Sequence, residues 1–515
     1  MLDFITERIY ELTALVAYLA ILLWIGVRSV KQIQTSTEYT LAGRNVPWTI
    51  LLATTAATMI GGGASVGMVS RVAQVGIAAA LVTCGWHLQL LLTGLFVAPR
   101  LRGLPLLTVG DYFHMKFGAL ARQLAVVNCV IFLIGVLVAQ MAAIGTVTNA
   151  ILGIPYSVGL WIGAVVTVFY STVGGMRAVV KTDVLQFVVL VVGIGAAAAV
   201  LFVRQGGFAE MSQRAHAGQF EITGHWSGMY VFSLFVTYML GESLVPPYTV
   251  RCFIAQDAEQ ARWGIAGAGI FLLLFLPLAT FILGTCAQVS PEVQQTLQEQ
   301  TAQMVSSTGI DQDTAQERAS QLAFPTLVRT AFHPIFAGIV VAAIIAAVMS
   351  SADSSLSCLS TVVMEDLYRR HWNLDASDRQ LLRVAQSTTL VTGVITAVLA
   401  WRFQNIAQIL EFVYDFWAPA MIVPFLVGVF WYRENRIYAA VFAMIAGMTA
   451  AAVWRFVVQK PFPGDISPTP FGFAVSLVVL FVALPVTRSW SLRSWFVPGT
   501  TNGESGDGNL ETVSS

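Results

Sequence analysis

Apolar runs long enough to cross a lipid bilayer recur along the whole chain, and they constrain its fold more than any other feature. A transmembrane helix needs about 20 apolar residues to cross a hydrocarbon core of about 30 Å. The sequence is 56% hydrophobic and only 11% charged, with a mean hydropathy of +0.73. It therefore predicts an all-α polytopic membrane protein with thirteen transmembrane helices. The candidate spans are about 9–29, 47–68, 76–98, 124–149, 156–173, 183–203, 227–248, 263–287, 334–363, 384–402, 408–431, 437–458 and 470–487.

The basic residues predict the orientation. With the N-terminus outside and the spans alternating, 19 of the 28 lysines and arginines fall on the inner side, Arg251 among them. An excess of basic residues marks the cytoplasmic side, so we expect the N-terminus outside and the C-terminus in the cytoplasm. The first span follows an acidic start, MLDFITERIYEL, which is the reverse of a cleavable signal peptide and indicates that this span is retained.

The stretch AAVMSSADSS, residues 346–355, lies within the apolar span 334–363. Ala347, Ser350, Ser351 and Ser354 share one face of a helix. Such a polar stripe has to face a protein interior or an aqueous cavity. Because hard cations prefer oxygen ligands, one interpretation is a sodium site. A hydroxyl-rich contact between helices is the other, and the segment alone favours neither.

Two spans contain helix breakers near their middle. Gly61, Gly62 and Gly63 are consecutive in TMIGGG, and Gly241, Pro246 and Pro247 interrupt YMLGESLVPPYTV. Glycines weaken a helix and prolines remove amide donors. The glycines are also compatible with close helix packing. Paired broken helices in two halves are typical of inverted-repeat transporters, so we expect a LeuT-like 5+5 inverted repeat with one helix before it and two after it.

This plan divides the chain into segments. Residues 1–46 form an N-terminal extra helix with a cytoplasmic loop, and 47–203 form the first five-helix repeat. Residues 204–226 form an outer loop, which precedes the second repeat at 227–431. That repeat includes an outer loop at 288–333, predicted to hold an amphipathic helix over the outer mouth. Two C-terminal helices follow at 432–490, and the tail 491–515 is predicted to be disordered and cytoplasmic.

Acidic residues within apolar spans are candidates for a functional site. For Asp183, the alternative to a functional role is that of a helix N-cap. For Glu242, the alternative is a water-exposed position in the outer vestibule. Asp353 adjoins the serine stripe, while Asp415 is as compatible with a hinge or a gate as with ligand contact. His87, Gln89 and Gln140 are weaker candidates for a cavity lining. There is no nucleophile–base pair and no metal–water arrangement, so an enzyme is not expected.

Three ordered motifs resemble those of the sodium:solute symporter family over about residues 5–490. They are LAGRNVPW, which opens the first core helix, GGMRAVVKTDVLQF from Gly174 to Phe187, and AAVMSSADSS followed by MEDLYRR. Within that family the pattern is most similar to the high-affinity choline transporter branch, through TMIGGG, GWHLQLLLTGLF, AAVMSSADSS and DASDRQLLR.

The resemblance implies a set of sodium ligands. The backbone carbonyls of Ala57 and Ile60, the carbonyl of Ala347 and the hydroxyls of Ser350 and Ser351 occupy the positions of the family's conserved site. A second cation, present in some members, is implied at Asp183, Asp353 and Ser354. Asp353 stands where some members have a hydroxyl, and it could strengthen cation binding or take a proton instead.

The resemblance to choline transporters is weaker at the substrate. Trp86 matches one aromatic of the cage that holds a quaternary ammonium by cation–π attraction. Met59, Val136, Val245 and Leu410 stand where other cage tryptophans would be, so we expect choline to bind poorly. The predicted solute contacts are Thr58, Met59, Gly61, Gly62, Trp86, Gln140, Glu242 and Tyr414.

The function predicted is a sodium-coupled secondary active importer of a small organic solute, working by alternating access. The alternatives are a solute sensor or transceptor on the same fold, a choline/betaine-type transporter, and a channel. We expect Na+ as the coupling ion with no cofactor. The expected partners are the solute and the lipid bilayer, without nucleic acid or an obligatory protein partner. The predicted location is the bacterial inner (plasma) membrane, as a multi-pass protein.

Overall fold

The computed structural model describes residues 9–30, 33, 35–431, 437–458 and 466–487. These residues form helices almost throughout, and the one β-bridge among them pairs Val46 with Ala255. The all-α fold class is confirmed. The helices before the second broken span are α2 Ile9–Val30, α3 Ser36–Leu41, η1 Ala42–Arg44, α4 Trp48–Met59, η2 Gly63–Gly67, α5 Met68–Val75, α6 Ile77–Val82, α7 Cys84–Leu92, η3 Thr93–Val97, α8 Ala98–Arg102, α9 Val109–Leu152, α10 Tyr156–Arg204 and α11 Gly207–Arg214.

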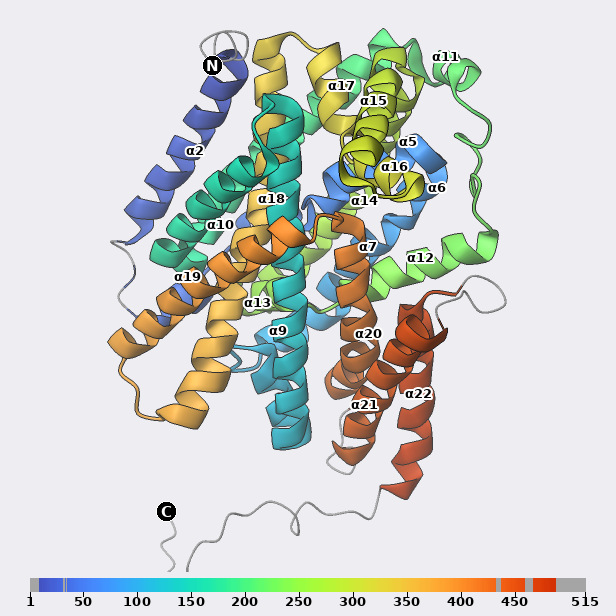
Figure 1. Ribbon diagram of the computed structural model, residues 1–515. Coiled ribbons are helices and arrows are strands. Elements are labelled where there is room, and N and C mark those ends of the chain that lie inside the picture. Colours follow the sequence, from blue (N-terminus) through green and yellow to red (C-terminus); the bar gives the residue numbers. More distant parts are fainter. Residues whose placement is uncertain (1–8, 31–32, 34, 432–436, 459–465, 488–515) are drawn as a thin grey trace, which may run out of the picture.

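The remaining helices run from the second broken span to the end of the described chain (Figure 1). They are α12 Gly228–Gly241, α13 Pro246–Ile254, α14 Ala258–Val289, α15 Pro291–Thr308, α16 Gln312–Ser320, α17 Ala323–Ala331, α18 Pro334–Val362, η4 Val363–Trp372, α19 Asp378–Arg402, α20 Ile406–Phe430, α21 Ile437–Val453, η6 Trp454–Val458 and α22 Pro468–Val486.

Each predicted span falls on these helices. Among the described residues, 10 helices are long and apolar enough to cross a membrane, or up to 12 if each bent pair is one span. The difference from thirteen arises in α10, which contains both predicted spans 156–173 and 183–203. Gly175 lies between them with φ 49° and ψ −157°, a conformation that glycine adopts far more readily than other residues, so the chain bends there.

Both predicted helix breaks are present. The axes of Trp48–Met59 and Gly63–Val75 differ by 62°, and those of Gly228–Gly241 and Pro246–Ile254 differ by 46°. At the first break the glycines permit the turn. At the second, Pro246 and Pro247 open α13, where the first turn of a helix needs no amide donor. Both breaks therefore follow from local sequence.

Helix α18 lies in the middle of the bundle (Figure 1). All residues from Val340 to Val362 are buried, because α18 packs against α2, α9, α10 and α19. A helix that is apolar all round, apart from small hydroxyl residues, suits such a central place. Its serines therefore face protein and not lipid.

The two predicted outer loops contain short helices. Region 204–226 contains α11, and region 288–333 contains α15, α16 and α17. These four helices gather at the end of the bundle where α2 begins, while α22 ends at the opposite end (Figure 1). The single amphipathic helix expected over the mouth is thus a cluster of three helices.

Candidate functional site

The broken helix α4 supplies free backbone groups at the centre of the bundle. Ile60 leaves the helix with φ −84° and ψ 69°. The Gly62 amide donates to Oε1 of Gln140 at 2.8 Å, and the Gly61 amide donates to the Met59 carbonyl at 3.0 Å. A Cβ added to Gly61 would lie 2.7 Å from Ser351 Oγ. The glycines therefore serve both expected roles, because they break the helix and let α18 approach it.

Hydroxyl groups of α18 lie against the carbonyls of this break. Ser350 Oγ lies 2.8 Å from the Ala57 carbonyl oxygen and 2.9 Å from the Ala347 carbonyl oxygen, and either of these can accept its hydrogen bond. Ser351 Oγ donates to the Thr58 carbonyl at 2.6 Å. Ser351 Oγ also lies 3.5 Å from the Ala347 carbonyl, so hydrogen bonds connect four of the five predicted sodium ligands. The fifth, Ile60, lies at the end of α4, and the Thr58 carbonyl is an additional oxygen.

A buried arginine contacts the same face of α18 one turn further along, at Ser354. Arg251, on α13, directs Nη2 to Asp183 Oδ2 at 2.9 Å and to Ser354 Oγ at 2.8 Å. The same Nη2 contacts the hydroxyls of Thr54 and Thr58. The side chains of Arg251 and Asp183 are both fully buried. Arg251, which the sequence analysis counted on the inner side, is therefore buried in the bundle, where Asp183 balances its charge.

Asp353 belongs to the same polar cluster but has a different partner. The hydroxyl of Tyr170 donates to its Oδ2 at 2.7 Å. Within the described chain, Oδ1 of Asp353 and Oδ1 of Asp183 have no hydrogen-bond partner. With both carboxylates ionised, two negative charges face one guanidinium, so the cluster keeps one net negative charge. Asp183 lies well inside α10, so the N-cap alternative for it is wrong.

A small cavity adjoins both polar groups. It has a volume of about 30 Å³, enough for one or two water-sized particles. Seven of the eight predicted solute contacts line it, and the eighth, Gly62, is tied to it through Gln140. The lining comprises Thr58, Met59, Gly61, Gly63, Ala64, Trp86, Phe132, Val136, Gln140, Glu242, Val245, Pro247, Tyr248, Ser351, Ser355, Leu410 and Tyr414.

Glu242 is the acidic residue of this cavity. The Tyr414 hydroxyl donates to its Oε1 at 2.5 Å and the Tyr248 hydroxyl donates to its Oε2 at 2.7 Å. Two neutral donors stabilise a carboxylate without cancelling its charge. The ring of Trp86 stacks on Tyr238 with centroids 4.3 Å apart. The cavity therefore combines one negative charge with aromatic and apolar walls.

Several residues at the site were not predicted from the sequence. Thr54 and Arg251 join the charged cluster, and Phe132 and Tyr248 line the cavity. The four positions expected to lack cage aromatics, Met59, Val136, Val245 and Leu410, do line it. Tyr248 carries a signal that sequence reasoning could have used, because it directly follows the two prolines of the broken helix.

Three other candidates lie away from this cavity. Asp415 forms an ion pair with Arg455, and the Thr469 hydroxyl donates to it at 2.6 Å, so it joins α20 to the C-terminal helices. His87 and Gln89 are buried on α7 but do not line the cavity.

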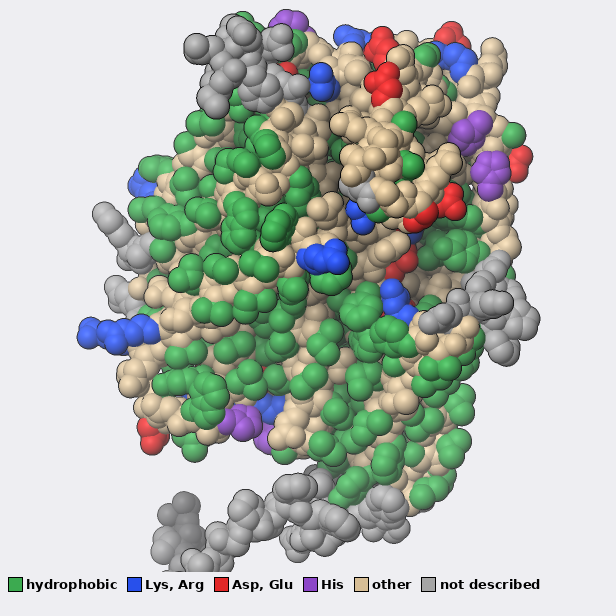
Figure 2. All heavy atoms as spheres, in the orientation of Figure 1, with side chains coloured by type: hydrophobic (Ala, Val, Ile, Leu, Met, Phe, Trp, Pro, Cys, Tyr) green, Lys and Arg blue, Asp and Glu red, His purple; other side chains and the backbone are tan. Residues whose placement is uncertain are grey.

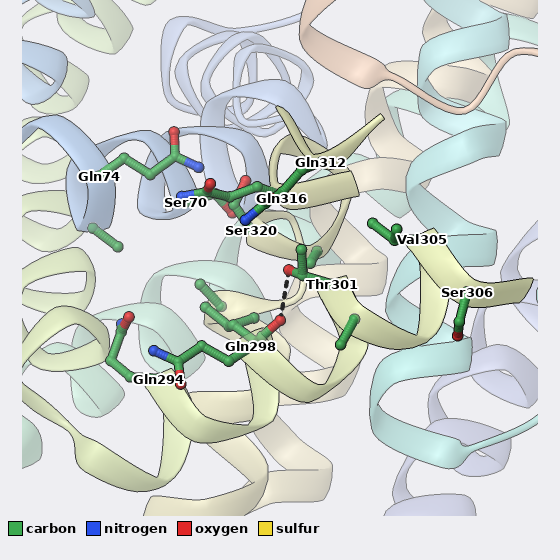
Figure 3. Close-up of a pocket in the computed structure, with 15 residues that line it drawn as sticks. Ser70, Gln74, Gln294, Gln298, Thr301, Val305, Ser306, Gln312, Gln316 and Ser320 are labelled. Atoms are coloured by element: carbon green, nitrogen blue, oxygen red, sulfur yellow. Dashed lines mark hydrogen bonds between the residues drawn. The ribbon is translucent and has the colours of Figure 1, made fainter. Parts of the chain in front are cut away.

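An ion pair joins separate helices of the bundle near the first break. Arg71 of α5 lies 2.7 Å from Glu411 of α20, and it also contacts the hydroxyl of Tyr238 on α12. These three helices are thereby held together. Ser70 and Gln74, which also lie on α5, border a larger cavity of about 660 Å³ under α15 and α16. Figure 3 shows that its labelled side chains are amides, hydroxyls and one valine, without a charged group.

Comparisons with known proteins agree with this architecture. The sequence pattern of the Sodium:solute symporter family matches residues 39–447. The High-affinity proline transporter PutP of Bacillus subtilis (strain 168) is 26% identical, over 91% of this chain and 96% of that protein. The Sodium/glucose cotransporter of Vibrio parahaemolyticus is 26% identical, over 86% and 85%. High-affinity choline transporter 1 of Caenorhabditis elegans is 23% identical, over 87% and 78%.

The fold is likewise shared with a solved transporter. The outward-open structure of a Na+-coupled sialic acid symporter superimposes with a TM-score of 0.77 at 20% identity, covering 93% of this chain and 97% of the other. At that identity the likeness concerns the fold, and it agrees with the predicted inverted repeat.

Proposed function

The chain belongs to the sodium:solute symporter family, and we propose that it imports a small, amine-bearing organic solute through the cavity at Glu242. Proteins of this family are transporters and not enzymes, with sodium as the coupling ion.

The proposed sodium ligands are the carbonyls of Ala57, Ile60 and Ala347 and the hydroxyls of Ser350 and Ser351. One observation supports this most: Ser351 donates to the Thr58 carbonyl and also lines the cavity. An ion at these oxygens would replace the hydrogen bonds that now join α4 to α18. It would then fix the wall of the solute cavity.

Coupling results from that shared wall. Sodium would bind the conformation in which α4 and α18 present their oxygens together, and the solute would bind the same conformation through Thr58 and Gly61. Two ligands that favour one state increase each other's affinity by the same factor. When the helices separate, both sites lose ligands and both ligands leave.

We place a second monovalent cation at Asp353. Arg251 already balances Asp183 and contacts Ser354, whereas Asp353 receives only a tyrosine hydroxyl and retains a free oxygen. A buried carboxylate without a counter-charge is costly. Uptake of one cation beside Asp353 would bring the net charge of the cluster to zero.

The proposed solute carries a protonated amine. Glu242 is the one carboxylate among the cavity residues, and both of its oxygens accept from neutral hydroxyls. The apolar walls suit a small hydrocarbon body, which the cavity of about 30 Å³ would have to widen to admit. Relatives named as transporters of proline are compatible with such a solute. The missing cage tryptophans disfavour choline.

The decisive experiment measures uptake and counterflow of labelled solute in proteoliposomes. A thermal-shift screen with amino acids, betaines, monocarboxylates and sugars, each in sodium and in potassium, identifies the labelled compound. We expect a ligand with an amine to stabilise the protein in sodium only, and then to be taken up down a sodium gradient. Stabilisation by neutral sugars alone would contradict the role of Glu242.

We further propose that the protein lies in a bacterial inner membrane with α15–α17 outside. The excess of inner basic residues supports this orientation, as do the bacterial relatives. A cysteine introduced at Gln303 of α15 should react with a membrane-impermeant maleimide on intact cells. Labelling only after lysis would reverse the orientation.

A further inference from the structure

A groove opens on the side of the bundle, away from the solute cavity. It has a volume of about 670 Å³ and is bordered by α9, by the junction of α19 with α20, and by α16. We propose that this groove binds one anionic phospholipid, and that the bound lipid controls the position of α20.

The long wall of the groove is apolar. Val130, Ile131, Ile134 and Val138 follow one face of α9. Around the groove, hydrophobic side chains are exposed on α19 and just beyond it, including Trp401 at 61% and Phe403 at 56%. Figure 2 shows a broad hydrophobic surface here, from which basic side chains emerge. A surface of this kind lies against acyl chains in a bilayer.

The rim of the groove is positively charged. It carries three arginines, of which Arg455 is paired with Asp415. Arg318 and Arg402 make no ion pair within the part of the chain that the structure describes. The nearby Glu317 accepts from Gln408, which leaves the rim with at least one net positive charge.

Charge and shape together select the occupant. A guanidinium fork suits the oxygens of a phosphate, and the apolar wall suits an acyl chain. A free phosphate would leave the apolar wall uncovered, and a zwitterionic lipid would leave the rim charge unbalanced. An anionic phospholipid such as phosphatidylglycerol satisfies both parts.

The first turns of α20 connect this groove with the solute cavity. Ile409, Phe412 and Val413 face the groove, whereas Leu410 and Tyr414 line the cavity. Between them, Glu411 forms the ion pair with Arg71. The helix packs closely on α9, since a Cβ at Gly135 would overlap with Val413. A lipid behind α20 would therefore stabilise the arrangement in which the Arg71–Glu411 pair is formed.

Binding is tested on the full-length protein in detergent, with thermal stability measured against short-chain phosphatidylglycerol, phosphatidylcholine and glycerol phosphate. We expect phosphatidylglycerol to stabilise, with at least about fivefold weaker binding in the double variant Arg318→Gln/Arg402→Gln. Arg402→Lys keeps the charge but loses the guanidinium fork, so its binding should be intermediate between those of Arg402→Gln and the original protein. Arg379→Gln, an exposed arginine at the other end of α19, is the matched control and should behave as the original protein.

Four outcomes would overturn the lipid site. Equal stabilisation by phosphatidylcholine would remove the requirement for a net negative charge, and equal stabilisation by glycerol phosphate would remove the requirement for acyl chains. Undiminished phosphatidylglycerol binding in the double variant, or an equal loss in Arg379→Gln, would remove the role of the rim arginines.

The effect on α20 rests on the proposed transport function and is measured separately. In proteoliposomes, adding phosphatidylglycerol to phosphatidylcholine should raise the uptake rate severalfold for the original protein but not for the double variant. If lipid binds yet leaves the rate unchanged, control of α20 is wrong. Sodium-independent uptake with intact lipid binding would instead contradict the proposed function and leave the lipid site standing.

Discussion

Two polar regions lie one turn apart on α18, and they differ in charge. One consists of neutral groups, and the other contains ionised side chains. At Ser350 and Ser351, neutral hydroxyls meet the backbone carbonyls of the broken helix α4. At Asp353 and Ser354, carboxylates, hydroxyls and the Arg251 guanidinium form a charged cluster. We call the first the hydroxyl region and the second the charged region. Both are buried and both were predicted to bind cations.

Because of this difference, one region is suited to reversible ion binding and the other to a permanent structural role. In the hydroxyl region, each hydrogen bond contributes about 1 kcal/mol net and can be exchanged for an ion. In the charged region, removing one member leaves a buried charge unpaired, at a cost of about 3–5 kcal/mol. The hydroxyl region is therefore suited to a coupling ion. The charged region is suited to holding α4, α10, α13 and α18 together, with Asp353 as its one unbalanced member.

The largest effect is expected from Arg251→Met. The substitution leaves Asp183 buried without its counter-charge, so we expect a strong loss of thermal stability or of folded protein on size-exclusion chromatography. A second substitution, Asp183→Asn, should recover much of the loss because it removes the stranded charge. If Arg251→Met alone folds as well as the original protein, the charged region does not hold these four helices together.

Next in size is the effect of removing a hydroxyl ligand. In Ser351→Ala, and in Ser350→Ala, one proposed ligand is lost, and we expect the sodium concentration for half-maximal uptake to rise about tenfold or more. The protein should remain folded. Ser357→Ala, also a buried serine of α18, is the control and should leave sodium dependence unchanged. An unchanged sodium dependence in both ligand variants would remove the ion from this helix.

A smaller effect is expected on the number of sodium ions transported with each solute molecule. Asp353→Asn should lower the charge moved per solute and reduce the sodium Hill coefficient toward one. Asp183→Asn should act mainly on stability, since its partner is Arg251. Electrical recordings with solute flux measure both quantities. If neither variant alters the Hill coefficient or the current per solute, these carboxylates are structural and no second cation binds there.

At the solute, Glu242→Gln keeps the size of the side chain and removes its charge. For an amine-bearing solute we expect about a tenfold rise in KM, with the sodium dependence retained. Gln140→Leu is a useful companion, because it removes the acceptor of the Gly62 amide and should disturb the break itself. A KM unaffected by Glu242→Gln would show that this carboxylate does not contact the solute.

The smallest signal is expected from choline. Because Met59, Val136, Val245 and Leu410 line the cavity without aromatic rings, labelled choline with sodium present should bind weakly or not measurably. Phe132 and Tyr248 supply two rings that the sequence did not indicate. Submicromolar binding would show that these rings complete a different cage.

The sequence predicted the parts of the molecule that depend on local chemistry. Glycines 61–63 and the prolines 246 and 247 indicate breaks because their effects act on their own helix. The serine face of α18 follows from helical periodicity alone. The ligand positions at Ala57 and Ile60 came from family resemblance, and no local pattern would have identified them.

Contacts between distant segments were beyond such reasoning. Arg251 is close to the end of an apolar span, where an arginine ordinarily faces the cytoplasm. Its burial depends on Asp183, which is 68 residues earlier in the chain. Likewise, the position of Phe132 in the cavity depends on how α9 packs on α20. Gly175, by contrast, acts locally, because it bends α10 between the two spans that the sequence predicted there.

The central claim is that sodium in the hydroxyl region is coupled to solute through the wall at Ser351 and Thr58. The most direct measurement is solute affinity in sodium and in potassium, by equilibrium binding, for the original protein and Ser351→Ala. We expect sodium to raise solute affinity by about 10-fold or more, solute to raise sodium affinity by the same factor, and Ser351→Ala to lose most of both. Independent binding of sodium and solute in the original protein, or an undiminished factor in Ser351→Ala, would contradict this coupling.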